Sequence, residues 1–291
     1  MKNYLELLQD IIDNGITKED RTGVGSRSVW GRCLHFDLQE GFPAITTRRV
    51  AFRIAFEEAM FMLRGDRNTK ILEDKNINIW KGNTSRNFLD ARGLEKFEEG
   101  DMGYAYGWQW RNFGGWDAGD APEEWHYSGI DQLTKMIEEI KANPFSRRHV
   151  ITAWNPQQIN DMALPPCHIF QQYQVTPDGK LNSSFFMRSN DVPYGLPYNI
   201  MVYGFILTAL AKLLGYEPGT LVYQGNDVHV YLNQMDMVKE QLTREVRSLP
   251  TLKINKDLNT LDDLLSLEYE DVELIGYDPH PDIKDKPPMA V

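Results

Sequence analysis

The alternation of hydrophobic and polar positions along the chain predicts a mixture of helices and strands. Apolar side chains recur at helical spacing over residues 4–12, and Asn14-Gly15 ends that pattern. The same reasoning predicts helices at residues 51–63, 130–140, 198–214 and 231–242, and strands at 28–38, 150–154, 169–175, 181–187 and 251–254. The two kinds of element do not alternate regularly, so we expect an α+β fold in a single domain over residues 1–291.

Two of the predicted helices, residues 51–63 and 198–214, are apolar on most sides and are therefore expected to be buried. Glu58 lies inside the first of them, where a carboxylate is costly unless it has a partner. Residues 82–101 and 114–124 are polar and charged, which favours surface insertions over domain linkers.

Composition excludes several classes of protein. The chain is 42% hydrophobic and 25% charged, as is usual for a soluble globular protein. A net charge of −11 argues against nucleic acid as the primary ligand. It still allows a small phosphorylated substrate, because a few local arginines can build a positive pocket on an acidic protein.

The cysteines and the apolar segments bear on where the protein is located in the cell and on which cofactors it could use. Cys33 and Cys167 are the only cysteines, too few for a disulfide framework and without the spacing of a zinc site. The N-terminus lacks the apolar core of a signal peptide, and the apolar stretch 200–214 is shorter than a membrane span. We expect a cytoplasmic or nuclear protein with no membrane contact. No glycine-rich phosphate loop follows a strand, so no metal, flavin or NAD(P) site is predicted.

The most reactive groups gather in one part of the chain. Residues 164–168 read Leu-Pro-Pro-Cys-His, and residues 187–191 read Met-Arg-Ser-Asn-Asp. A thiol beside a guanidinium is a plausible thiolate nucleophile, although a buried free cysteine is more often structural. His168 is not expected to form a dyad with Cys167, because successive side chains of a strand point to opposite faces.

These two runs belong to a longer series of motifs. The others are Asp20 to Gly25 (DRTGVG), Gly41 to Arg48 (GFPAITTR), Gly103 to Arg111 (GYAYGWQWR), Ser146-Arg147-Arg148, Ala153-Trp154-Asn155, Gly195 to Ile200 (GLPYNI), Gly225 to Tyr231 (GNDVHVY), Gly276 to Pro281 (GYDPHP) and Met289-Ala290-Val291. In content and order the series resembles the folate-dependent thymidylate synthase family over nearly the whole chain. Any one motif would be a weak signal, but together they are specific.

The resemblance implies a thymidylate-synthase-like fold, with a mixed β-sheet packed by helices and a homodimer formed through the sheet. It implies transfer of a one-carbon unit from 5,10-methylenetetrahydrofolate to C5 of dUMP, giving dTMP and dihydrofolate. The equivalent of Cys167 adds to C6 of the pyrimidine, which makes C5 a nucleophile.

The resemblance also assigns the nucleotide-binding residues. Phosphate is held by Arg21, Arg147, Arg148, Arg188 and Ser189, with Arg147 and Arg148 reaching across the dimer interface. Arginine forks suit a phosphate dianion, although an adjacent arginine pair alone is more often a solvated face. His229 and Tyr231 hold the sugar 3′-hydroxyl.

Asn199 selects the base, because an amide can donate to O4 and accept from N3–H of uracil, whereas an aspartate would suit cytosine. Asn199 could equally serve as a helix cap, and both roles can coexist.

Proton transfer and folate binding account for the remaining residues. Glu58 resembles the general acid/base of the family, and a partly buried carboxyl group can have the raised pKa that this work needs. Tyr106 matches the tyrosine that organises water near the C5 proton, and Arg188 favours the thiolate. Folate is held by Trp80, Asp191, Gly195 and the C-terminal Val291.

The chain departs from the usual family sequence at several positions, which leaves the fate of the one-carbon unit open. Met187 stands in place of glutamine, Tyr194 in place of leucine, Tyr104 in place of proline and Gln234 in place of histidine. The run 187–191 also resembles hydroxymethylases, in which water captures the one-carbon unit and tetrahydrofolate leaves. A homologue without activity could instead bind nucleotide or RNA as a regulator, but such a protein would not need the thiol.

Overall fold

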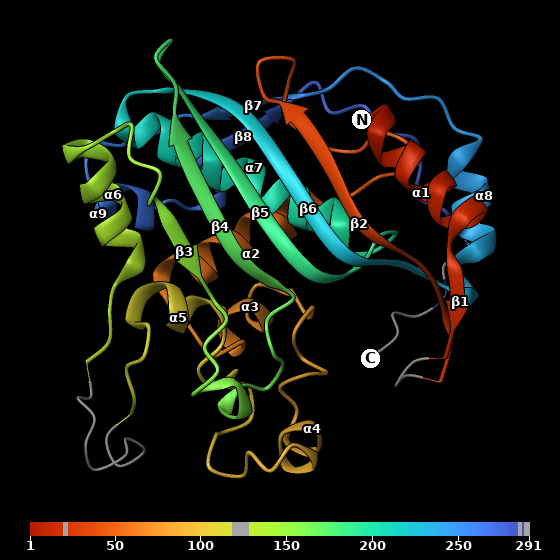
Figure 1. Cartoon of the computed structure of the whole chain (residues 1–291), viewed down its shortest axis with the longest axis horizontal. Helices are drawn as coiled ribbons and strands as arrows, with labels where there is room; N and C mark the ends of the chain where they lie inside the picture. The colour runs from red at the N-terminus through yellow and green to blue at the C-terminus, as the bar shows by residue number, and fades with distance from the viewer. Residues whose placement is uncertain (20–22, 118–127, 285–286, 288–291) are drawn as a thin grey trace. The chain divides into compact units, whose positions relative to one another are not determined.

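The computed structural model describes residues 1–19, 23–117, 128–284 and 287. Within it the chain forms two compact units. Unit 1 comprises Met1–Phe56 and Val175–Val291, and unit 2 comprises Glu57–Gln174. Figure 1 labels their helices and strands.

Unit 1 is built on a mixed sheet. Its strands are β1 (Ile16–Lys18), β2 (Ser26–Asp37), β5 (Lys180–Asp191) and β6 (Glu217–Tyr231), in the order β1-β2-β6-β5. β5 and β6 run parallel, whereas β2 is antiparallel to both β1 and β6. β7 (Thr251–Ile254) and β8 (Val272–Ile275) form a separate antiparallel pair. The predicted α+β class with a mixed sheet is therefore confirmed.

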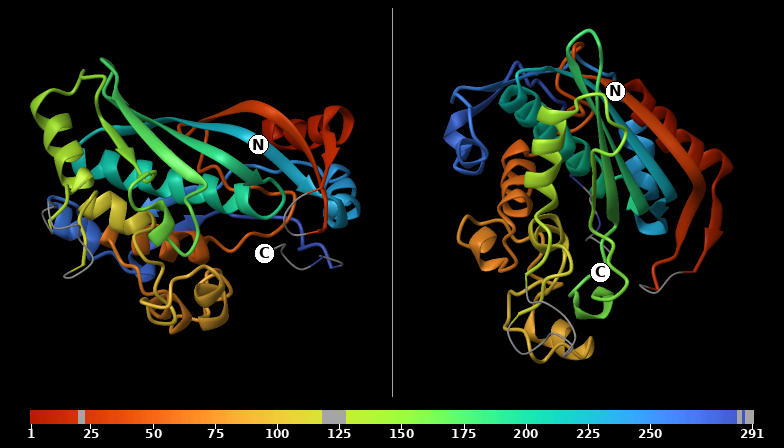
Figure 2. Two further views of the ribbon diagram at one scale, coloured as in Figure 1. Left: turned by 60° about the horizontal axis from the view of Figure 1, so that its bottom comes forward. Right: turned by 60° about the vertical axis from the view of Figure 1, so that its left-hand side comes forward.

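Helices cover one face of this sheet. α7 (Gly195–Leu214) packs against β5 and β6, and in Figures 1 and 2 it runs across one side of these two strands. α7 ends where Gly215 adopts a left-handed conformation with φ of 76°, which only glycine accepts without cost. By length and composition α7 could cross a membrane, but most of its residues are buried, as in a core helix. The other helices of the unit are α1 (Lys2–Asn14), α8 (Met235–Leu242) and α9 (Leu261–Leu265), with the 3-10 turns η2 (Leu232–Gln234) and η3 (Tyr269–Asp271).

Unit 2 is mainly helical. α2 (Phe52–Arg64) passes into it from unit 1, and α3 (Lys70–Glu73), α4 (Arg86–Ala91), α5 (Tyr106–Asn112), α6 (Gln132–Ala142) and the 3-10 turn η1 (Ile159–Asp161) follow. β3 (Val150–Thr152) pairs antiparallel with β4 (His168–Val175), and α6 packs against α5 and β3. The expected insertion at residues 82–101 carries α4, and three of its side chains join a small buried cluster: Leu89, Leu94 and Phe97.

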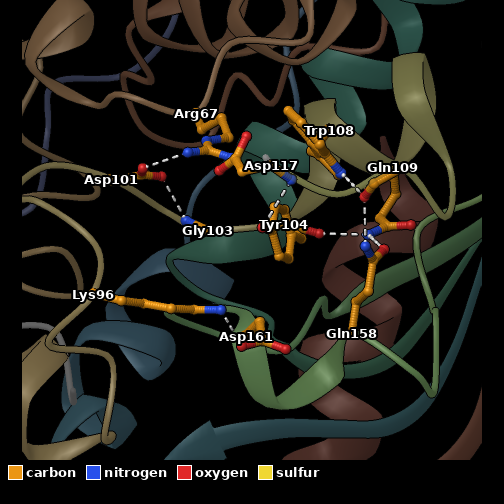
Figure 3. A network of polar contacts seen from close by, with 11 residues as sticks. Arg67, Lys96, Asp101, Gly103, Tyr104, Trp108, Gln109, Asp117, Gln158 and Asp161 are labelled. Atoms are coloured by element: carbon orange, nitrogen blue, oxygen red, sulfur yellow. Dashed lines mark hydrogen bonds and ion pairs between the residues drawn. The ribbon is translucent and has the colours of Figure 1, made fainter. Parts of the chain in front are cut away.

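Arg67 is part of a network of polar contacts in unit 2 (Figure 3). Its guanidinium pairs with Asp101 at 2.8 Å and with Asp117 at 2.7 Å, as Figure 3 shows. The same group lies 4.9 Å from the ring centre of Trp108 and 5.5 Å from that of Tyr104. Ion pairing and ring contacts together fix the two loops that carry the aspartates. A cavity of about 370 Å³ opens beside Arg67, and no predicted site residue lines it.

Candidate active site

The predicted site residues divide between the two units. Unit 2 contains Glu58, Trp80, Tyr106, Arg147, Arg148 and Cys167. Unit 1 contains Arg188, Ser189, Asp191, Gly195, Asn199, His229 and Tyr231. Arg21 and Val291 lie outside the described residues, so their predicted roles stay predictions.

Cys167 is held at its backbone by Tyr106. Cys167 is half-buried and directly precedes β4. Its backbone N–H donates to the hydroxyl oxygen of Tyr106 at 2.9 Å. Tyr106 is the first residue of α5 and is almost fully buried, so its ring is fixed by packing. The start of α5 therefore positions the predicted nucleophile, a role that the sequence did not reveal.

His168 packs against the same tyrosine. The two rings stack with centroids 4.2 Å apart. Burial lowers the pKa of His168 to about 3, so its imidazole is neutral near pH 7 and is a weak base. This arrangement agrees with the prediction that His168 does not serve as the base for Cys167.

Glu58 and Trp80 form the next part of this set. Glu58 lies on α2 and is 8% exposed, and burial raises the pKa of its carboxyl group to about 7. The indole N–H of Trp80 donates to Glu58 Oε1 at 3.1 Å, which favours the ionised form and opposes part of that rise. The Trp80 ring lies 5.6 Å from the ring of Tyr106. Glu58, Trp80, Tyr106 and Cys167 thus form one continuous set, and its carboxyl group titrates near neutrality, as a general acid/base requires.

In unit 1, the parallel pairing of β5 and β6 brings several predicted residues to one edge of the sheet. Ser189 lies opposite Asp227, and Asp191 lies opposite His229. The ring of Tyr231 meets that of His229 edge to face, with centroids 5.1 Å apart. Because parallel strands end at the same edge, residues about forty positions apart in sequence become neighbours there.

Asn199 is the fifth residue of α7 and contacts a second amide. Asn190 Nδ2 donates to Asn199 Oδ1 at 3.1 Å, and the Tyr223 hydroxyl donates to Asn190 Oδ1 at 3.3 Å. We call Asn190 and Asn199 the amide pair. These bonds leave Asn199 Nδ2 as a donor and one lone pair on Oδ1, the pattern that matches O4 and N3–H of uracil.

Gly195 permits the close approach of this pair. A Cβ atom at Gly195 would lie 3.3 Å from Asn190 Nδ2 and 3.6 Å from Asn199 Oδ1. Gly195 was predicted to contact folate, and in this structure it lies against the amide pair. Asn190 was missed as a site residue, although it directly precedes Asp191 in the 187–191 run.

Asp191 is held by two donors. The backbone N–H of Tyr194 donates to Oδ1 at 3.2 Å, and Gln234 Nε2 donates to Oδ2 at 3.0 Å. Burial raises the pKa of Asp191, and the Gln234 bond is the largest effect that opposes this rise. The sequence marked Gln234 as a departure from the family but gave no sign of this contact.

The arginines of the predicted phosphate site have different surroundings. Arg147 and Arg148 are exposed in unit 2, whereas Arg188 is half-buried near the end of β5. Among the residues that the structure describes, no group of three or more His, Cys, Asp or Glu side chains is arranged to hold a metal ion.

Comparison with known proteins gives one consistent result. The thymidylate synthase family matches residues 2–291. Thymidylate synthase 1/2 of Encephalitozoon cuniculi is 44% identical over 283 residues, which cover 97% of this chain and 95% of the relative. The bifunctional dihydrofolate reductase-thymidylate synthase of Leishmania major is 43% identical over 285 residues, and there the chain spans 54% of the relative. The chain therefore belongs to the thymidylate synthase family, a family of enzymes that transfer a one-carbon unit as a methyl group.

Proposed function

We propose that this chain catalyses the reductive methylation of dUMP by 5,10-methylenetetrahydrofolate. The products are dTMP and dihydrofolate. The observation that carries the proposal is the continuous set of contacts in unit 2. Cys167 is hydrogen-bonded to Tyr106, the ring of Tyr106 contacts Trp80, and Trp80 is hydrogen-bonded to the buried Glu58. A protein that only binds nucleotide needs neither the thiol nor a carboxyl group with a pKa of about 7.

Cys167 acts as the nucleophile. Its thiolate adds to C6 of the uracil ring, and the electron pair released at C5 attacks the methylene carbon of the folate. Glu58 moves protons through water near O4. The attack by C5 breaks one of the two carbon–nitrogen bonds that hold the methylene carbon in the folate. C5 then loses its proton and the second carbon–nitrogen bond breaks, which leaves an exocyclic methylene on the pyrimidine and releases tetrahydrofolate. Hydride transfer from tetrahydrofolate to this methylene gives the methyl group and dihydrofolate. Loss of the thiolate from C6 then frees the product.

The amide pair supports selection of uracil over cytosine. With Oδ1 already accepting from Asn190, Asn199 presents its NH₂ group as the donor to O4. The amino group of cytosine at the same place would face another donor. That mismatch leaves a polar group unpaired and disfavours dCMP.

Phosphate binding and dimerisation belong to the same proposal. Arg21, Arg147, Arg148, Arg188 and Ser189 hold the nucleotide phosphate, and Arg147 and Arg148 act on the site of a second copy. Their exposure leaves both side chains available to another chain. Strand residues with large exposed apolar side chains also favour a homodimer formed through strands: Trp30 at 72%, Val150 at 38% and Phe170 at 37%.

The folate co-substrate is held by Trp80, Asp191, Gly195 and Val291, and the sugar by His229 and Tyr231. We further propose a cytoplasmic or nuclear location, no metal, flavin or NAD(P), and neither membrane nor nucleic acid as a primary partner. Size-exclusion chromatography with light scattering tests the dimer, and fluorescence microscopy of a tagged protein tests the location.

A product assay tests the reaction. The protein is incubated with dUMP and methylenetetrahydrofolate, the nucleotide is analysed by mass spectrometry, and dihydrofolate is followed by absorbance. Methylated nucleotide with equal dihydrofolate is expected. Hydroxymethylated nucleotide without dihydrofolate would replace the proposal with a hydroxymethylase. In a parallel sample, Cys167→Ala should abolish turnover and retain dUMP binding, whereas an inactive wild-type protein that binds nucleotide would favour a regulator.

A further inference from the structure

Gln234 joins two parts of the predicted site that the sequence separates. It is the last residue of η2, directly after β6, and its side chain is fully buried. Its Oε1 accepts from the backbone N–H of Tyr231 at 3.0 Å, and its Nε2 donates to Asp191 Oδ2 at 3.0 Å. One amide therefore bridges the end of the strand that carries His229 and Tyr231 to the carboxyl group at the end of β5.

The chemistry of the partners fixes the direction of this amide. A backbone N–H can only donate, so the atom facing Tyr231 is the oxygen. The NH₂ group then faces Asp191, which must accept. Glutamine satisfies both neighbours in a single orientation and does not titrate. Gln234 therefore donates to Asp191 at every pH at which the protein is folded.

Asp191 needs such a donor because burial raises the pKa of its carboxyl group, and other nearby groups also interact with its charge. His229 comes from β6, Arg48 from the segment before α2, and Tyr4 from α1. Arg48 donates to the Pro193 carbonyl, and the Tyr4 hydroxyl donates to the Val192 carbonyl at 3.2 Å. Among the described residues, the hydrogen bonds to the carboxylate oxygens come from Gln234 and from the Tyr194 backbone.

We propose that Gln234 is a positioning residue that holds Asp191 as an acceptor and ties it to the strand that carries the sugar-binding residues. Gln234 thereby links the proposed folate-binding carboxylate of Asp191 to the end of β6, whose His229 and Tyr231 are proposed to bind the nucleotide sugar. The inference rests on the proposed function only through the ligands assigned to Asp191, His229 and Tyr231; the hydrogen bonds themselves do not depend on it.

Gln234→Glu provides the sharpest test, because it keeps the shape of the side chain. One oxygen still accepts from Tyr231, and the other faces Asp191 at close range. Two carboxyl groups so placed share one proton. At low pH the shared proton allows a hydrogen bond between the introduced carboxyl group and Asp191. At high pH both carboxyl groups are ionised, and two negative charges face each other.

The KM for methylenetetrahydrofolate of Gln234→Glu should therefore be close to that of the wild type at low pH. It should rise roughly tenfold to a hundredfold as the pH passes the upper apparent pKa of the pair, since a hydrogen bond to a charged group contributes about that factor. In Gln234→Met, which cannot donate, the KM should be raised at every pH. The wild type should lack this pH-dependent rise, and kcat at saturating folate should change less than KM in both variants.

Gln241→Glu is the matched control. Gln241 is a buried glutamine on α8 whose Nε2 donates to Thr47 Oγ1 at 2.9 Å rather than to Asp191. It should lower stability without making the folate KM depend on pH. If Gln234→Glu follows the wild type at every pH, or if Gln241→Glu gives the same rise, the inference is wrong.

A second measurement separates this inference from the proposed function. The pKa of Asp191 is read from its carboxyl ¹³C shift in wild type and in Gln234→Met. Loss of the donor should raise it by roughly one unit or more. An unchanged pKa would refute the role of Gln234, whereas absent dUMP methylation by wild type would refute only the proposed function.

Discussion

Replacing Glu58 by glutamine should make the protein more stable above neutral pH and nearly inactive. The buried carboxyl group has a pKa of about 7 in the folded protein, against an ordinary value of 4.5. An acid whose pKa is raised by folding contributes its full stability below the unfolded pKa and loses it as pH rises through the folded pKa. Ionised Glu58 therefore costs stability progressively between about pH 4.5 and 7, and the full cost persists above that range.

The difference between these two pKa values corresponds to roughly 3 kcal/mol. Glutamine resembles the protonated acid and keeps an oxygen that can accept from Trp80, so it avoids this cost. Urea unfolding of Glu58→Gln and wild type from pH 5 to 8 should show the difference in unfolding free energy growing by roughly 2–3 kcal/mol toward high pH. The kcat should fall roughly a hundredfold or more, as on loss of a general acid/base. If the unfolding difference is the same at pH 5 and 8, Glu58 is not a buried acid with a raised pKa.

Three further substitutions probe the supports of the site. Trp80→Phe removes the donor to Glu58, so the pKa of Glu58, read from the dependence of kcat on pH, should rise by roughly one unit. An unchanged pH profile would contradict the role of the indole N–H. Tyr106→Phe leaves the N–H of Cys167 without its acceptor, and the rate of thiol alkylation and kcat should both fall roughly tenfold with little change in the KM for dUMP. Tyr223→Phe removes the donor that orients the amide pair, so the KM for dUMP should rise roughly three- to tenfold while inorganic phosphate inhibits as before.

The elements with strong local patterns could be predicted from the sequence. The helices at 51–63, 130–140 and 198–214 correspond to α2, α6 and α7, and the strands at 28–38 and 169–175 to β2 and β4. Each combines a clear apolar period with a recognisable end. The helix predicted at 231–242 starts too early, because Tyr231 ends β6 and α8 begins only at Met235.

β6 shows where local reasoning fails. It is the longest strand, yet the proline and glycine at 218 and 219, and the Gly-Asn-Asp run at 225–227, hide its alternation. β6 forms because β2 pairs with one edge and β5 with the other. The two neighbouring strands satisfy its backbone hydrogen bonds, so tertiary pairing overrides the weak propensity of these residues.

The candidate site contains two kinds of residue: those that the proposed chemistry requires, and those that only hold them in place. A nucleophile, an acid/base and a base-reading amide must be particular residue types, so the family resemblance could assign these proposed roles to Cys167, Glu58 and Asn199. Their supports must only place a donor or an acceptor at one point, and any of several residues can do so. Tyr106 supports a residue 61 positions away, and Gln234 one 43 positions away. Because such contacts depend on the fold rather than on spacing, a substitution at a supporting position that looks neutral in the sequence can still change how the site titrates.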